Sequence, residues 1–424
     1  MSTASDSDLP PEIGALTALQ ARLRRVTETL AHELARPSAA GPDWSETEWL
    51  LARAVATIHG VSPLLARSLR WQGPPGWQAF LEDQRTHTVT RHERIRELLR
   101  QLHDAGRSAG LVMIALKGAA LHDLQLYAPG ERPMADVDLL VRQQDAPRAG
   151  QVLADLGFHW THTNFKHQVF ERGEGAPSDF GENSTNGMKI EVHSHIREAL
   201  PRRIADISAC IFPRAADPRA TEPGLNYYPS RSALMLHLLL HAAGAMAGRA
   251  VRLIHLNDIS RLAASMSSRD WDELLTHERT LNQTLWWAFP PLAMTARYYD
   301  SIPEHVVTTL APRCQWWLRR VCDRRSLCDV SLSHLWVTAF PGIEWARSPR
   351  EMLTYVVRRV APDAQVRSLR KVLATIEPAA AQSTWAHMSQ GRRLFRWLTS
   401  RPARPEALRP IRMALASRVS GAPG

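Results

Sequence analysis

The sequence is short of cysteine and of long apolar runs, and each shortage excludes a class of protein. Its four cysteines, among 424 residues, form no CxxC pair and no regular metal-ligand spacing, which excludes a disulfide-rich scaffold and a standard zinc motif. The longest uncharged run, Ser232–Gly248, contains two histidines and is too short and polar for a membrane span. The first residues lack a basic stretch followed by an apolar one. We therefore expect a cytoplasmic protein with no secretory signal and no transmembrane segment.

Lysine is also scarce, although the chain is strongly basic. Only four of the 52 lysine and arginine residues are lysines, and the formal net charge is +10. This excess of positive charge suits anionic partners such as nucleotides or RNA. Three of the four lysines, Lys117, Lys166 and Lys189, lie between residues 117 and 189. Where arginine is so strongly preferred, a lysine indicates that a compact point charge is needed.

Apolar periodicity changes along the chain and divides it into segments. The 3.6-residue period of helices dominates as far as residue 106, short strand-like runs alternate with short helices to residue 227, and helices dominate again beyond it. We therefore predict an α+β fold in which a small mixed β-sheet core is flanked by N-terminal helices and a mainly α-helical C-terminal domain. The predicted segments are a flexible leader (1–42), a helical segment (43–106), the sheet core (107–227), the helical C-terminal domain (228–398) and a basic flexible tail (399–424).

Two aspartates, Asp136 and Asp138, lie one residue apart in the strand-like run ADVDLLV. Alternate side chains of a strand share a face, so the two carboxylates are predicted to be neighbours. Two unit charges about 4 Å apart repel by roughly 4 kcal/mol at an effective dielectric near 20, a cost that a divalent cation removes. Carboxylate, water and phosphate oxygens are the ligands that Mg²⁺ prefers. The pair therefore predicts a site for Mg²⁺ (or Mn²⁺) that presents a nucleoside triphosphate.

A turn upstream of this pair is a candidate phosphate site. Lys117, Gly118 and Ala119 lie where an apolar strand gives way to a short helix. Glycine permits close backbone approach there, and the first N–H groups of the helix attract anions. Arg132 can add a forked contact to phosphate oxygens. The alternatives are a surface lysine at a strand end and a loop arginine without a ligand.

A third carboxylate, Glu191, lies in the later strand MKIEVHSH, with His193 on the same face. A two-metal site commonly needs a third acid to hold the metal that activates an acceptor hydroxyl, and Glu191 takes that place if its strand pairs beside Asp136 and Asp138. Solvated acids at a strand edge are the alternative. Further candidates for substrate contact are Lys189, His193, His241 and Asp258. For the last two, a packed helix and an ion pair are the alternatives.

The order of these motifs resembles one known family. A strand ending in Lys-Gly, a short helix, a tyrosine, an Arg-Pro-Met loop, an Asp-x-Asp pair and an acidic-x-His strand are similar to the uncharacterised nucleotidyltransferases of the DNA polymerase beta-like superfamily. The similarity covers roughly residues 90–300 and includes the His-rich stretch LHLLLHAAGAMAGRAVRLIHLNDISRL. It implies a mixed-sheet nucleotidyltransferase core, Mg²⁺ dependence and transfer of a nucleoside monophosphate from an NTP.

The resemblance also carries roles over to individual residues. It implies that Gly118 and Ala119 form the phosphate turn, that Asp136 and Asp138 are the paired metal ligands, and that Glu191 is the third acid. Ala119 departs from the serine or glycine that the superfamily often has, so a possible hydroxyl contact is lost. Glu191 stands where aspartate is commoner, which lengthens the reach of the third ligand.

Residues and resemblance together predict a metal-dependent nucleotidyltransferase that moves an NMP from an NTP to a hydroxyl acceptor and releases pyrophosphate. The acceptor stays open among RNA, a protein, a small molecule and a modified peptide. A non-catalytic RNA- or partner-binding protein that keeps the scaffold is the main alternative, and a metal-dependent phosphohydrolase is another. The predicted catalytic metal ligands are Asp136, Asp138 and Glu191, and the predicted nucleotide contacts are Lys117, Gly118, Ala119 and Arg132.

Overall fold

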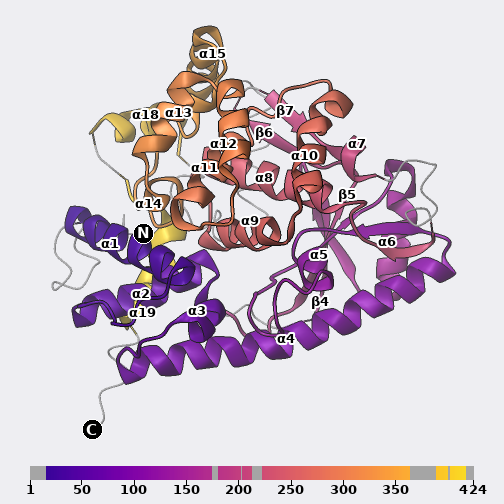
Figure 1. Cartoon of the computed structure of the whole chain (residues 1–424), viewed down its shortest axis with the longest axis horizontal. Helices are drawn as coiled ribbons and strands as arrows, with labels where there is room; N and C mark the ends of the chain where they lie inside the picture. Colours follow the sequence, from indigo (N-terminus) through magenta and orange to yellow (C-terminus); the bar gives the residue numbers. More distant parts are fainter. Residues whose placement is uncertain are drawn as a thin grey trace.

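The structure is a computed structural model, and it describes residues 16–173, 180–201, 203–212, 222–362, 388–399 and 402–416. The fold is mixed α+β, as the sequence predicts, with a six-stranded mixed sheet, a second sheet of two strands and a helical C-terminal region. Figure 1 shows N-terminal helices at one end, the sheet at the other, and the long helix α4 running along the base of both. The outer ends of the predicted leader and tail, residues 1–15 and 417–424, lie outside the described residues.

Four helices form the N-terminal part of the described chain. A capping box starts the second: the Ser45 side chain accepts the Glu48 N–H, and the Glu48 carboxylate accepts the Ser45 N–H. That helix ends at Gly60, whose φ of 65° lies in the left-handed region that closes many helices. The four helices are α1 (Leu16–Ala35), α2 (Glu46–His59), α3 (Ser62–Ser68) and α4 (Pro75–Ser108).

The central sheet has the strand order β3-β4-β5-β2-β1-β8. β2 pairs parallel with β5, and this register places Asp138 directly opposite Glu191. β1 pairs antiparallel with β2 and parallel with β8, and β4 pairs antiparallel with both β3 and β5. The strands are β1 (Val112–Ala115), β2 (Val137–Leu140), β3 (His159–Thr163), β4 (His167–Arg172), β5 (Met188–His193) and β8 (Gly224–Asn226).

Both faces of this sheet are covered, which explains why its central strands read as continuous apolar runs. On one face, Val137 and Leu139 of β2 pack in a cluster with residues of α4 and of α6 (Ala146–Asp155), which follows the short 3-10 helix η3 (Gln143–Asp145). On the other face, Leu140 joins the larger core with α8 (Arg231–Ala247). Asp138 lies on this second face, so the core encloses one of the predicted acids.

Further short elements and the C-terminal helices complete the structure. β6 (Arg197–Leu200) and β7 (Arg203–Asp206) form an antiparallel hairpin that leads into α7 (Ser208–Ile211). Two short 3-10 helices, η5 (Ala311–Arg313) and η6 (Ile343–Trp345), lie between the later helices. The remaining helices of the described residues are α9 (Leu253–Ser265), α10 (Ser268–Leu281), α11 (Phe289–Tyr298), α12 (Glu304–Leu310), α13 (Trp316–Arg324), α14 (Leu327–Val330), α15 (Pro349–Val360), α18 (Gln390–Thr399) and α19 (Pro405–Ala416).

Two features differ from the sequence-based expectation. The β6–β7 hairpin and β8 are too short and too polar to show a strand period, so the sequence did not indicate them. Part of the segment expected to be a flexible tail is the helix α19, whose Leu408 and Ile411 join the main core next to α2. Pro405 opens this helix at a position where a missing N–H costs nothing. The segment boundaries themselves stay predictions.

No single helix among the described residues combines the length and apolar character needed to cross a membrane. The helices α2 and α3, bent by 114° at the break between them, pass that test only as a pair. Leu51 and Val55 of α2 and Leu64 and Leu65 of α3 are buried in the protein core.

The packing of α19 predicts that the C-terminal segment contributes to stability. Ile411→Ala should lower the free energy of unfolding by about 2 to 5 kcal/mol, because it empties a fully buried position in the core. The shift of the urea denaturation midpoint measures this effect. Glu406→Gln, an exposed change on the same helix, is the matched control. Equal midpoints for Ile411→Ala and wild type would mean that α19 is not docked.

Candidate active site

The three predicted carboxylates lie together where β2 meets β5. Asp138 and Glu191 are register partners on these parallel strands, so their side chains share a face. Asp136 immediately precedes β2 and lines the same cavity. Asp138 and Glu191 are only 6% and 7% exposed. Their charges need partners, because an isolated buried carboxylate is strongly unfavourable.

Asp138 is held by two donors. Lys117 Nζ and His193 Nε2 each lie 2.9 Å from its Oδ1 atom. Burial by itself would raise the pKa of Asp138, but the Lys117 charge and the His193 hydrogen bond outweigh burial and hold this pKa well below the usual value. Burial would likewise lower the pKa of Lys117, and the charges of Asp138 and Asp136 raise it instead. Lys117 and Asp138 therefore form a buried ion pair, and removal of one partner from such a pair costs about 3 to 5 kcal/mol.

The pKa of Asp136 is shifted in the opposite direction, upward. Burial and the negative charges of Asp138 and Glu191 raise its pKa to about 6. The two neighbouring aspartates therefore differ, since Asp138 stays ionised while Asp136 takes up a proton in mildly acidic solution. The cavity holds more negative charge than the surrounding lysines neutralise.

Glu191 is contacted by one lysine and two histidines. Lys189 Nζ lies 2.5 Å from its Oε1 atom. His167 Nδ1 and His193 Nε2 lie 3.2 Å and 4.0 Å from its Oε2 atom. His167, Glu191 and His193 form a possible metal-binding cluster, because their ligand atoms all lie within 4.8 Å of one another. His167 was not a predicted site residue, and only the pairing of β4 with β5 brings it here.

Asn164 determines which nitrogen of His167 carries the proton. The Oδ1 atom of Asn164 accepts the backbone N–H groups of Lys166 and His167, at 2.8 and 3.0 Å, so its amide NH₂ faces His167 Nε2 at 2.8 Å. Nε2 therefore accepts, and the neutral ring carries its proton on Nδ1, toward Glu191. Burial lowers the pKa of His167 to about 4, which keeps the ring neutral. In this tautomer Nδ1 offers no lone pair to a metal, and this atom has no hydrogen-bond partner among the described residues although it lies near Glu191.

The turn from β1 into α5 (Gly118–Asp123) positions Lys117. Lys117 has a φ of 45° and a ψ of −112°, a conformation that costs about 1 to 3 kcal/mol for a residue other than glycine. Its N–H donates to the Tyr228 hydroxyl at 3.1 Å. Gly118 leaves no room for a side chain, since a Cβ atom would lie 2.4 Å from Arg132 Nη1 and 3.0 Å from Met134 Sδ. Position 118 therefore requires glycine, because the turn packs directly against Arg132.

Arg132 and Asp258, both predicted to contact ligand, bind each other. The Nε and Nη2 atoms of Arg132 lie 2.8 and 2.7 Å from the two carboxylate oxygens of Asp258. The Tyr127 hydroxyl donates to the same carboxylate at 2.7 Å. The guanidinium fork expected to hold phosphate is therefore engaged by a protein carboxylate, although both residues still line the cavity.

A cavity of about 290 Å³, here named the acid cavity, contains this cluster. Two acidic or basic residues of its lining that were not predicted are Glu182 and Arg252. Arg252 precedes α9, and the only sequence signal for it was an Arg-Leu pair after the His-rich helix. No sequence pattern indicated Glu182, which lies in a loop. The predicted site residues that line the acid cavity are Lys117, Gly118, Arg132, Asp136, Asp138, Glu191, His241 and Asp258.

A smaller cavity of about 100 Å³ adjoins the acid cavity. Lys117, Glu191 and His241 line both cavities, so Glu191 stands at their common wall. Lys166 also lines the smaller one, and its Nζ atom lies 2.6 and 2.7 Å from the two carboxylate oxygens of Glu198. We name it the histidine cavity, after His167, His193, His237 and His241.

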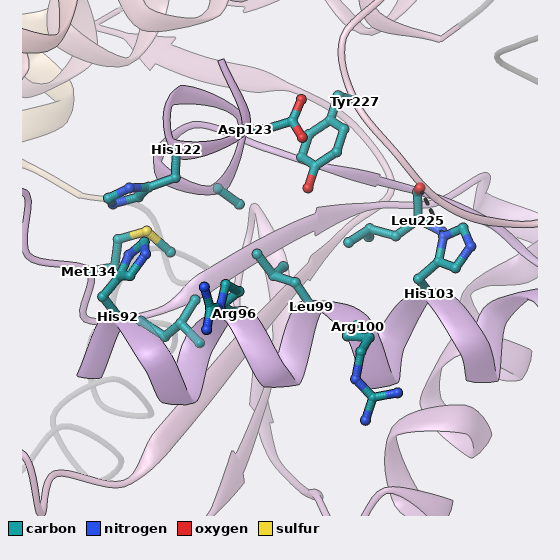
Figure 2. A pocket seen from close by; sticks show the side chains of 12 residues that line it. His92, Arg96, Leu99, Arg100, His103, His122, Asp123, Met134, Leu225 and Tyr227 are labelled. Carbon is teal, nitrogen blue, oxygen red and sulfur yellow. Dashed lines mark hydrogen bonds between the residues drawn. The ribbon is translucent and has the colours of Figure 1, made fainter. Parts of the chain in front are cut away.

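A third cavity, of about 420 Å³, lies between α4 and α5. Figure 2 shows His92, Arg96 and His103 of α4 along one side and His122 of α5 across from them. Ala119, predicted to contact phosphate, lines this third cavity, and its N–H is donated to Leu116 O at 3.2 Å. Ala119 therefore lies apart from the acid cavity; Lys189 and His193 are also absent from its lining, but both lie near Glu191.

The raised pKa of Asp136 predicts that this acid destabilises the metal-free protein. The folded chain holds the Asp136 proton more tightly than the unfolded chain, so this group lowers stability as pH rises from about 4 to about 6 and remains unfavourable above 6. Asp136→Asn should therefore raise Tm at pH 7.5 without added metal, and the gain should shrink toward pH 5. Differential scanning calorimetry measures both, with the exposed Asp155→Asn on α6 as control. A gain that is the same at both pH values would contradict this account of Asp136.

Comparison with known proteins gives one assignment. The family model described as "Uncharacterised nucleotidyltransferase" matches residues 45–288, which is more than half of the chain. Searches of curated proteins and of solved structures found no match. The matched range includes every residue that lines the acid cavity, from Lys117 to Asp258. The chain therefore belongs to this family of uncharacterised nucleotidyltransferases.

Proposed function

We propose that this chain transfers a nucleoside monophosphate from an NTP to a hydroxyl acceptor in the acid cavity, with release of pyrophosphate. The β2–β5 register supports this most, because it brings Glu191 beside Asp138 at the cavity that Asp136 also lines. Three acids that face one cavity together with Lys117 suit a divalent cation and a triphosphate. Membership of the family supports transferase chemistry in general.

The donor set fits Mg²⁺ or Mn²⁺. Asp136, Asp138 and Glu191 offer carboxylate oxygens, the hard ligands that these ions prefer. His193 donates to Asp138 through Nε2, and His167 carries its proton on Nδ1, so the two rings favour the acids and not a nitrogen-liganded metal. Burial raises the pKa of Asp136, and the negative charges of Asp138 and Glu191 raise it further; a bound cation would offset those two charges. A divalent cation held by these acids would neutralise phosphate charge during transfer.

Different residues of the acid cavity would position the phosphates and the acceptor hydroxyl. Lys117, fixed by Asp138, and Arg252, at the start of α9, contribute positive charge for the phosphate oxygens. The Arg132–Asp258 pair shapes the cavity wall against Gly118. Glu191 orients the acceptor hydroxyl and takes up its proton. Such transfer depends mainly on positioning and charge stabilisation.

The proposed transfer needs no reactant other than the NTP and the acceptor. The acceptor oxygen attacks the α-phosphorus, and a new O–P bond forms. The bond between the α-phosphorus and the bridging oxygen breaks, and its electron pair leaves with pyrophosphate. The acceptor proton passes to Glu191 and from there to water.

Replacement of Glu191 and replacement of the two aspartates should affect NTP binding and turnover differently. Glu191→Gln should lower label transfer about 10³-fold, equivalent to about 4 kcal/mol of transition-state stabilisation, while NTP binding stays largely intact. Asp136→Asn/Asp138→Asn should lose both turnover and metal-dependent NTP binding. Incubation with each α-³²P-labelled NTP, Mg²⁺ or Mn²⁺ and candidate acceptors measures turnover, and calorimetric titration measures NTP binding.

Glu171→Gln provides the matched control, because Glu171 is an exposed acid on β4 opposite Lys189 of β5. It should leave both measurements unchanged. Equal label transfer by wild type and by Asp136→Asn/Asp138→Asn would contradict the proposal. Absence of metal-dependent NTP binding with retained RNA or partner binding would favour a non-catalytic scaffold, and pyrophosphate release with no labelled acceptor would favour a phosphohydrolase.

A further inference from the structure

We infer that the histidine cavity receives the acceptor, and that the acceptor is the 3′ end of a single-stranded nucleic acid. The terminal sugar hydroxyl would enter the cavity while the terminal base stacks outside it on Phe165. This inference rests on the proposed function, because it assigns the acceptor for transfer in the acid cavity.

The position of Glu191 gives the direction of acceptor entry. The attacking oxygen and the leaving pyrophosphate lie roughly in line on opposite sides of the α-phosphorus. Glu191 and Lys117 line both the acid cavity and the histidine cavity. With the triphosphate in the acid cavity, a hydroxyl that comes from the histidine cavity meets Glu191 before it meets phosphate.

The size of the histidine cavity limits what can enter it. It measures about 100 Å³, whereas an engineered cavity that binds one benzene molecule measures about 150 Å³. A hydroxyl on a few carbon atoms, such as the edge of a sugar, fits this space, but a nucleobase does not. A nucleotide acceptor must therefore leave its base outside the cavity.

Phe165 and Arg197 provide a place for that base beside the cavity. Phe165 lies in the turn between β3 and β4, next to the lining residue Lys166, and is 41% exposed. Arg197, also a lining residue, holds its guanidinium 4.8 Å from the Phe165 ring centre and donates to Phe165 O at 2.8 Å. An aromatic ring next to an arginine is the usual platform for the bases of single strands.

Arg197 also has unused hydrogen-bonding capacity. Its Nε atom is shielded from solvent and has no hydrogen-bond partner in the part of the chain that the structure describes. Lys166, the neighbouring cation, is already paired with both oxygens of Glu198. A phosphodiester next to the terminal sugar would be attracted by the charge of the Arg197 guanidinium, which lines the histidine cavity, whereas the shielded Nε atom itself is out of its reach. A hydroxyl on a protein or a neutral small molecule would need neither this charge nor the exposed ring, so the observations favour nucleic acid.

The test uses a single-stranded RNA ten-mer and a DNA ten-mer with α-³²P-labelled NTP and Mg²⁺ or Mn²⁺. Wild type should label the 3′ end of at least one strand. Phe165→Ala should raise KM for that strand about 10-fold, in the range expected for loss of one stacked base. Arg197→Ala should raise the same KM, and both variants should keep the wild-type KM for NTP. Trp316→Ala, which removes an exposed ring from α13, is the control and should change neither constant.

A strand whose last nucleotide lacks both 2′ and 3′ hydroxyls gives a second readout. It should compete with the normal strand for binding, measured by fluorescence anisotropy, yet receive no label. Label transfer to protein or small-molecule hydroxyls with none to either strand would overturn the inference and leave the proposed function standing. An unchanged KM in Phe165→Ala and Arg197→Ala would also overturn it. Absence of metal-dependent NTP binding would remove the proposed function and this inference together.

Discussion

Asp138 and Glu191 are register partners on two parallel strands, and the repulsion between their buried charges governs what surrounds them. Lys117 faces one acid and Lys189 the other, at 2.9 and 2.5 Å. These contacts explain why the turn before α5 accepts a strained backbone at Lys117, since that conformation places the side chain against Asp138. The remaining acid, Asp136, has a raised pKa because burial and the negative charges of Asp138 and Glu191 outweigh the charges of Lys117 and Lys189.

The three clustered lysines of the sequence have a common structural role. Lys117, Lys166 and Lys189 each pair with an acid at the two adjoining cavities, namely Asp138, Glu198 and Glu191. An ammonium group is a compact charge on a flexible stem, and it fits between close carboxylates where a planar guanidinium would need more room. In a chain so rich in arginine, the rare lysines were therefore a more informative signal than net charge. The alternation of Asp136 and Asp138 was a second local signal, and both acids line one cavity.

Other parts of the site depend on contacts that no local pattern records. The sequence predicts a phosphate contact for Arg132, and in the structure Asp258, from a helix more than a hundred residues later, accepts from its Nε and Nη2 atoms. His167 carries no motif, and only the β4–β5 register brings it to Glu191. Ala119 belongs to the turn by sequence, yet in the structure it lines the cavity between α4 and α5. Local periodicity predicts which strands exist, whereas strand order and helix docking decide which side chains meet.

The docking of α19 on α2 has a consequence for synthesis of the chain. Ile411 and Leu408 cover apolar residues of a helix that emerges from the ribosome some 350 residues earlier. Until α19 has been synthesised, α2 lacks one of its neighbours, and closure of the main core requires contacts of very high sequence separation. A nascent chain that stops short of α19 therefore leaves apolar residues of α2 uncovered.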